Sequence, residues 1–176
     1  MLNDVAWALA AIFSLVAGWT DWRSRRIPNW LTVPGLLAGI VFNTAAFGWA
    51  GAKGSLLGTA LGLGLLLPFV MIRSLGAGDW KLIGALGAIL GPQRLIVVLI
   101  GTILVNGIMA VILVIWKRRG WQTLRNLASL VGSLLTLHKP SSELSLDNPD
   151  AIKIPFGVAV AITVTAFAVS FVWRPL

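Results

Sequence analysis

The sequence predicts an all-α membrane protein with about six transmembrane helices, the fourth of them short, and a further amphipathic helix on the cytoplasmic surface. Of the 176 residues, 57% are hydrophobic and only 11% are charged, whereas about 25% of the residues of a soluble domain are charged. The hydrophobic residues also occur in blocks long enough to cross a bilayer, which takes roughly 20 helical residues. Because backbone polar groups in hydrocarbon must be satisfied within their own segment, we expect these blocks to be helices of a single domain, residues 1–176.

The apolar blocks set the order of the predicted spans. They cover residues 4–20, 30–49, 55–72, 80–90, 94–116 and 154–173. The fourth block has eleven residues, and at about 1.5 Å per residue it covers little more than half of the hydrocarbon thickness. We therefore expect it either to re-enter the membrane or to end inside the protein, with a tight turn at Gly91 and Pro92 before the fifth span.

The basic residues predict the orientation of the spans. If the N-terminus lies outside, one face of the membrane receives eleven of the Lys and Arg residues and the other receives three. Cytoplasmic loops carry the excess of positive charge, so the first face is predicted to be cytoplasmic and both termini to lie outside. The net charge of +8 is thus interpreted as a topology signal and not as a surface for nucleic acid.

Residues 117–153 are predicted to form a cytoplasmic connector between the fifth and sixth spans. Within it, apolar side chains recur at helical spacing, at Trp121, Leu124, Ala128, Val131 and Leu135. This spacing indicates an amphipathic helix lying on the membrane surface. A seventh span is the alternative, but Arg125 and Asn126 leave an apolar run that is too short for it.

The composition also excludes several kinds of site. The chain contains no cysteine, which excludes disulfides, thiolate metal sites and cysteine nucleophiles. Its single histidine, His138, lies in the polar connector, so a histidine-based metal centre is not expected. We predict that the protein uses neither a cofactor nor a metal.

Two of the six carboxylates are candidates for function, because they lie beside apolar spans where a carboxylate is costly. They are Asp21 and Asp79. Each has an ordinary alternative: Asp21 can pair with a nearby arginine, Arg23 or Arg25, at a helix end, and Asp79 can be the N-cap of the fourth helix. The predicted topology, however, places both at the cytoplasmic edge of the membrane, although 57 residues separate them in sequence.

Two carboxylates that face each other can hydrolyse a peptide bond together. Because their negative charges repel at close range, such a pair shares one proton. The ionised member activates a water as general base, while the protonated member polarises the scissile carbonyl. Gly76 and Gly78 allow an unusual turn and a close approach of substrate backbone to Asp79. Lys81 either favours the ionised form of Asp79 or extends to the membrane interface.

Three motifs around these residues resemble those of the type IV prepilin peptidases, the GxGD aspartic peptidases of bacterial membranes. They are Asp21-Trp22-Arg23 leading to Ile27-Pro28-Asn29, then Gly76-Ala77-Gly78-Asp79-Trp80-Lys81, and Ile154-Pro155-Phe156-Gly157 at the start of the last span. A GxGD motif alone is common by chance. Three motifs in this order, each at the predicted cytoplasmic edge, are more specific and cover nearly the whole chain.

The resemblance implies a peptidase of the bacterial cytoplasmic membrane whose active site faces the cytoplasm. Its substrates would be prepilins or pseudopilins, in which a basic leader precedes an apolar helix, and its other partners would be membrane lipids. Asp21 and Asp79 would be the catalytic acids. The residues expected to support them are Gly76, Gly78, Lys81, Pro28, Asn29, Pro155 and Phe156. Pro28 and Pro155 are equally suited to starting a helix.

The chain departs from the longer family members, which carry a cytoplasmic insertion with cysteine pairs that is associated with N-methylation of the cleaved pilin. Without cysteines, this short form is expected to be a peptidase that lacks methyltransferase activity, similar to those of tight-adherence (Flp-type) pilus systems. Two other functions stay open. A proton-coupled transporter would fit the short fourth span, and a non-catalytic assembly subunit of a pilus or secretion system would fit the small size.

Overall fold

The fold is given by a computed structural model, which describes residues 2–117 and 155–172. Within these ranges the regular elements are the helices α1 (Leu2–Ser24), α2 (Asn29–Met71), α3 (Ala77–Lys117) and α5 (Phe156–Val172). Of these, α1, α2 and α3 are long and apolar enough to cross a membrane, and α5 is a shorter apolar helix. The predicted connector lies, from residue 118 on, outside the described residues, and so does its amphipathic helix.

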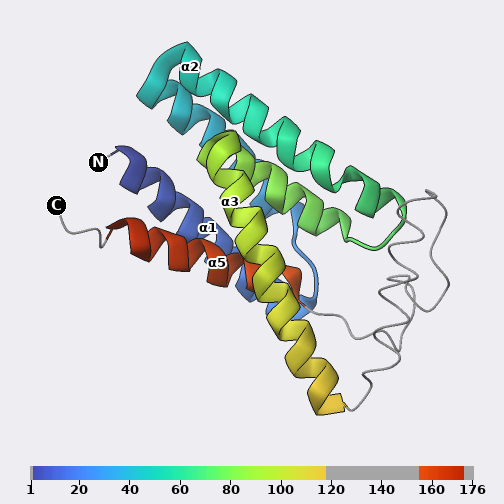
Figure 1. Cartoon of the computed structure of the whole chain (residues 1–176). Helices are drawn as coiled ribbons and strands as arrows, with labels where there is room; N and C mark the ends of the chain where they lie inside the picture. Colours follow the sequence, from blue (N-terminus) through green and yellow to red (C-terminus); the bar gives the residue numbers. More distant parts are fainter. Residues whose placement is uncertain (1, 118–154, 173–176) are drawn as a thin grey trace.

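Both long helices contain a break at a glycine. Gly48 in α2 has φ 60° and ψ −141°, and Gly91 in α3 has φ 76° and ψ 172°. Glycine takes such positive φ values at no steric cost. At these breaks α2 and α3 fold back on themselves, so that each consists of two arms (Figure 1). The arms of α2 are residues 29–47 and 49–71, and those of α3 are residues 77–90 and 92–117.

The described chain thus runs through six helical segments in the order of the predicted spans. The break predicted at Gly91 and Pro92 is present. The gap predicted at residues 50–54 is wrong, because the helix resumes directly after Gly48. Gly51 and Ala52 are buried in the second arm, and the small side chains there let the two arms meet without a longer loop. That all six segments cross the membrane stays a prediction.

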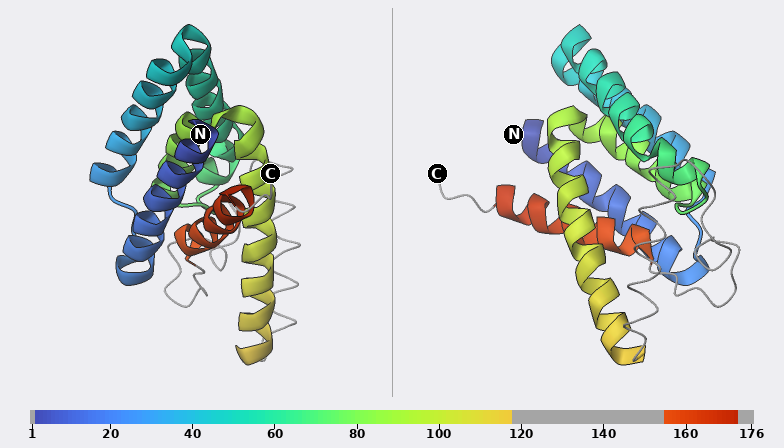
Figure 2. Two further views of the ribbon diagram at one scale, coloured as in Figure 1. Left: turned by 90° about the vertical axis from the view of Figure 1, so that its left-hand side faces the viewer. Right: turned by 45° about the vertical axis from the view of Figure 1, so that its right-hand side comes forward.

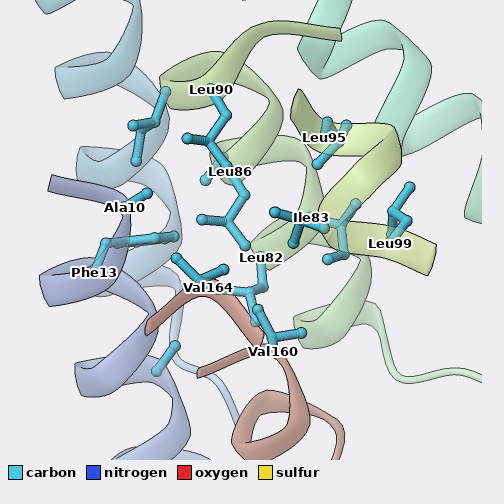
Figure 3. Packing of buried hydrophobic residues seen from close by; sticks show 14 of the residues in the cluster. Ala10, Phe13, Leu82, Ile83, Leu86, Leu90, Leu95, Leu99, Val160 and Val164 are labelled. Atoms are coloured by element: carbon cyan, nitrogen blue, oxygen red, sulfur yellow. The ribbon is translucent and has the colours of Figure 1, made fainter. Parts of the chain in front are cut away.

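The first arm of α3 is the centre of the bundle. Every residue from Leu82 to Leu90 is buried. Leu82, Leu86 and Leu90 recur every fourth residue on one face of the helix, and they point toward Phe13 of α1 and Val164 of α5 (Figure 3). The short fourth span therefore ends inside the protein, which is one of the two possibilities that its length allowed.

Small residues bring the helices into close contact. The second arm of α2 and the first arm of α3 meet backbone to backbone at Gly58 and Gly87. A Cβ at Gly18 of α1 would lie 2.8 Å from the Cβ of Ala161 in α5. Because lipid is as apolar as a leucine side chain, helices in a membrane associate through such close packing rather than through the hydrophobic effect.

Helices α1 and α5 are antiparallel neighbours (Figure 1). Near the start of α1, Trp7 stacks on Phe171, with ring centroids 5.2 Å apart. Near its end, Gly18 lies against Ala161. The start of α1 and the end of α5 therefore lie at one end of the bundle, and the end of α1 meets the start of α5 at the other.

The second arm of α3 crosses α5 and extends beyond it (Figure 2). At the crossing, a Cβ at Gly101 would lie 2.6 Å from the methyl group of Thr163. Further along this arm Ile108 and Ile115 are 62% and 71% exposed. In a bilayer these side chains face lipid, so their exposure needs no protein partner.

The break in α3 is stabilised by polar side chains of α2. Asn43 Nδ2 donates to the carbonyl oxygens of Ala88 and Ile89 at 2.9 and 3.0 Å, and Ser55 Oγ donates to that of Ala88 at 2.7 Å. The last carbonyls of a helix have no partner within the helix, and an unsatisfied carbonyl in hydrocarbon is costly. Asn43 and Ser55 thus allow α3 to end one arm inside the bundle.

We predict that Asn43→Leu lowers the free energy of unfolding by about 1–2 kcal/mol, because it leaves the buried carbonyl of Ile89 without its side-chain donor and that of Ala88 with Ser55 alone. Thermal unfolding in detergent micelles measures the change. Thr44→Val is the matched control, since the Thr44 hydroxyl is exposed and donates only within its own helix, to Ile40 O at 2.7 Å. Equal stability of the two variants would contradict this role of Asn43.

Candidate active site

Asp21 and Asp79 lie together at the end of the bundle where α1 ends and α3 and α5 begin. Asp21 is in the last turn of α1 and is only 6% exposed. Asp79 is in the first turn of α3 and is partly buried. The negative charge of Asp21 acts on the carboxyl group of Asp79, so the two groups lie within electrostatic range. The structure thus brings within electrostatic range the two carboxylates singled out in the sequence.

Asp79 caps the helix in which it lies. The carbonyl of Gly76 accepts the Trp80 N–H at 3.1 Å, which makes Gly76 the N-cap of α3 and Asp79 its third helical residue. The Asp79 carboxyl in turn accepts a hydrogen bond from the Gly76 backbone amide, which is the reach-back contact of a capping box. The interpretation of Asp79 as the N-cap itself is therefore wrong. The helix N-terminus favours a negative charge at this place.

The two glycines of the GxGD motif provide space. A Cβ at Gly76 would lie 3.0 Å from Asp79 Oδ2, and a Cβ at Gly78 would lie 3.0 Å from the carbonyl oxygen of Ile27 and 3.2 Å from its Cβ. Neither glycine has a positive φ, so neither is required by a left-handed backbone conformation. Gly78 is needed because the segment after α1 packs directly on the first turn of α3.

Asp21 is held by a helix other than its own. Its Oδ2 accepts the backbone N–H of Gly157, the second residue of α5, at 2.8 Å in a buried hydrogen bond. Arg25 also acts electrostatically on this carboxyl, as expected for one of the two candidate arginines. A carboxylate near the C-terminal end of its own helix is unfavourable, whereas the N-terminus of α5 compensates for that position.

Gly157 is the contact that sequence reasoning missed. The third motif led to Pro155 and Phe156 as site residues. Pro155 instead precedes α5, where its carbonyl accepts the Ala159 N–H at 3.5 Å, and Phe156 packs against the hydrophobic core. The glycine directly after them was visible in the same motif and was the available signal. A Cβ there would lie 3.0 Å from the Cβ of Asp21.

The segment between α1 and α2 completes the site. Pro28 is the N-cap residue of α2, with φ −78° and ψ 150°, and its carbonyl accepts the N–H of Leu31 at 3.1 Å. Asn29 Oδ1 accepts a hydrogen bond from Lys81 Nζ at 2.9 Å. Pro28 thus starts a helix. Lys81 has a specific partner, Asn29, that neither of the two sequence interpretations anticipated.

Within residues 2–117 and 155–172, no three His, Asp or Glu side chains gather into a group that could hold a metal ion. The chemically reactive groups of the site are the carboxyls of Asp21 and Asp79. Each has one oxygen bonded to a backbone amide at a helix N-terminus. A shared proton and an activated water are the chemistry available to such a pair.

Comparison with known proteins gives a match to one family. The model of the type IV leader peptidase family matches residues 8–112. The matched range includes α1 from residue 8, all of α2 and most of α3, and it contains both Asp21 and Asp79. No curated protein and no solved structure matches the chain.

We predict that Gly157→Ala lowers the free energy of unfolding by about 1–3 kcal/mol, because the added methyl group overpacks the contact with Asp21. The new Cβ would lie 3.1 Å from Asp21 Oδ2 and 3.3 Å from the carbonyl oxygen of Ala17. Gly54→Ala is the control, since a Cβ there meets nothing within 4 Å. Thermal unfolding in detergent should show a lower midpoint for Gly157→Ala and an unchanged one for Gly54→Ala. An unchanged unfolding midpoint for Gly157→Ala would refute the close packing.

Proposed function

Since the chain belongs to the type IV leader peptidase family, we propose that it removes the leader from prepilin-like substrates by an aspartic mechanism centred on Asp21 and Asp79. The family implies a membrane-embedded protease that acts on prepilin-type substrates. The observation that carries the proposal is that the two carboxyls lie within electrostatic range of each other at one end of the bundle. Each is held by a backbone amide, and the charge of one acts on the other.

In the proposed reaction one carboxyl is ionised and the other is protonated. The ionised carboxylate takes a proton from a water molecule, whose oxygen then attacks the carbonyl carbon of the scissile peptide bond. The protonated carboxyl donates a hydrogen bond to the carbonyl oxygen and stabilises the negative charge that forms there. Collapse of this intermediate breaks the C–N bond, and a proton from the pair is transferred to the leaving amine.

The surrounding contacts support the pair. Gly76 holds one oxygen of Asp79, and the amide after Phe156 holds one oxygen of Asp21. Each contact leaves the second carboxyl oxygen for water or substrate. Gly78, Pro28 and Asn29 bring the segment after α1 against the first turn of α3. Pro155 positions the start of α5.

The proposal extends to the place and the scope of the reaction. The excess of Lys and Arg on one predicted face supports a site that opens to the cytoplasm, at the inner membrane of a bacterium. The absence of cysteine from the whole chain supports leader cleavage without N-methylation, as in the short Flp-type peptidases that the chain resembles.

A transporter is less well supported. Broken membrane helices of carriers present unwound carbonyls to an ion. At the break in α3, the carbonyls of Ala88 and Ile89 instead accept hydrogen bonds from Asn43, and Ser55 also donates to Ala88. The short fourth span is the feature that favours the carrier hypothesis. Its burial in the core explains why it is short without a transport function.

Replacement of either aspartate by asparagine should lower the rate of leader cleavage by about 10³-fold or more, because asparagine cannot carry or exchange the proton. The measurement is co-expression with a prepilin-like substrate, followed by its shortening on a gel, for wild type, Asp21→Asn and Asp79→Asn. Asp4→Asn is the control, because Asp4 lies in the first turn of α1, at the far end from the site.

A cleaving Asp21→Asn or Asp79→Asn variant would rule out the two-carboxyl mechanism. If wild type itself shortens none of several substrates while the protein is inserted and folded, the assembly-subunit hypothesis replaces the peptidase.

A further inference from the structure

The segment Arg25–Pro28 connects α1, which carries Asp21, with α2, which packs against α3, the helix that carries Asp79. It begins directly after the last turn of α1, where the Arg25 N–H donates to the backbone carbonyl of Asp21 at 2.8 Å. It then passes Ile27, which is buried, and leads into α2 at Asn29. Because the segment is joined directly to the last turn of α1, its position on α3 bears on where Asp21 lies relative to Asp79.

Two of the contacts that hold residues 27–29 on α3 lie on either side of Asp79 in the sequence. Before Asp79, Gly78 is in direct contact with the backbone of Ile27. After it, Lys81 Nζ donates to Asn29 Oδ1 at 2.9 Å. Residues three apart share one face of a helix, so Gly78 and Lys81 present a single face of α3 to the incoming chain.

From this arrangement we propose that the Lys81–Asn29 hydrogen bond is a tether that sets the separation of the two carboxyls, and that Lys81 is a positioning residue of the reaction. The inference rests on the proposed function of the pair. Of these contacts, the tether is the one made by a side-chain hydrogen bond, whereas Ile27 is held by packing at Gly78 and in the hydrophobic core. An ammonium group bound to an amide oxygen makes a charge-assisted hydrogen bond, which is stronger than a neutral one.

The competing role for Lys81 is electrostatic, with its positive charge acting directly on Asp79 or on the substrate. The two roles differ in what Asn29 does. A tether needs both partners equally, whereas a direct charge effect needs the lysine alone. A double-mutant cycle on the two residues therefore separates them.

The test is the cleavage rate of Lys81→Met, Asn29→Ala and the double variant, with purified enzyme and a prepilin-like substrate. We expect each single variant to lower kcat by about 10- to 100-fold with little change in KM, since the substrate still binds but the carboxyls are misplaced. The double variant should be no slower than the slower single variant. Lys53→Met is the control, because Lys53 lies beside the break of α2 at Gly48, with its Nζ 5.7 Å from the ring centroid of Trp49.

Two kinetic outcomes would overturn the tether. If Asn29→Ala cleaves like wild type while Lys81→Met is slow, the lysine acts through its charge. If the losses of the single variants multiply in the double variant, the two residues act independently.

A second measurement tests the tether without reference to activity. Because the chain has no cysteine, spin labels can be attached at Ser24→Cys, the last position of α1, and at Ser74→Cys, which precedes α3. Lys81→Met and Asn29→Ala should widen the distance distribution equally, and Lys53→Met should leave it narrow. An unchanged width in both variants refutes the tether, even if inert Asp21→Asn and Asp79→Asn variants uphold the peptidase.

Discussion

The constraint on which the structure depends is that two carboxyl groups lie within electrostatic range of each other at one end of an apolar bundle. Arg25 acts electrostatically on Asp21, but the partners that position both carboxyls are backbone amides. Each is bonded to the first turn of a helix, Asp79 to that of α3 and Asp21 to that of α5. Backbone amides at a helix N-terminus stabilise negative charge without adding a mobile side chain. The convergence of two helix N-termini with the end of α1 is therefore what allows the pair to exist.

The packing of the first arm of α3 determines where Asp79 lies, and this helix is surrounded by apolar side chains rather than by water. The first arm of α3 starts at the site and is buried along its whole length from Leu82. A helix that is surrounded by protein does not need to match the thickness of the membrane. It does need partners for its last carbonyls, and Asn43 and Ser55 provide them. These two polar residues of α2 thus make it possible for Asp79 to begin a short central helix.

Much of this could be predicted from the sequence, because apolar blocks and glycines are local signals. The order of the helices, the break at Gly91 and the two aspartates all follow from residues that lie next to each other in the chain. The contacts Asp21–Gly157 and Lys81–Asn29 could not be predicted, since they join residues 136 and 52 positions apart. The gap predicted at residues 50–54 differs from the observed break at Gly48 for a related reason. A single glycine is enough to reverse the chain there because Gly51 and Ala52 let the arms of α2 pack closely.

The bond between Asp21 and Gly157 also has a consequence for the order in which the protein matures during synthesis. Asp21 and Asp79 are translated first, and the ribosome must add another 78 residues after Asp79 before Gly157 exists. Until α5 has been inserted beside α1, Asp21 lacks the amide that holds it. A nascent chain halted before that helix therefore contains both acids but not the finished pair, so the last described helix acts as the step that completes the enzyme.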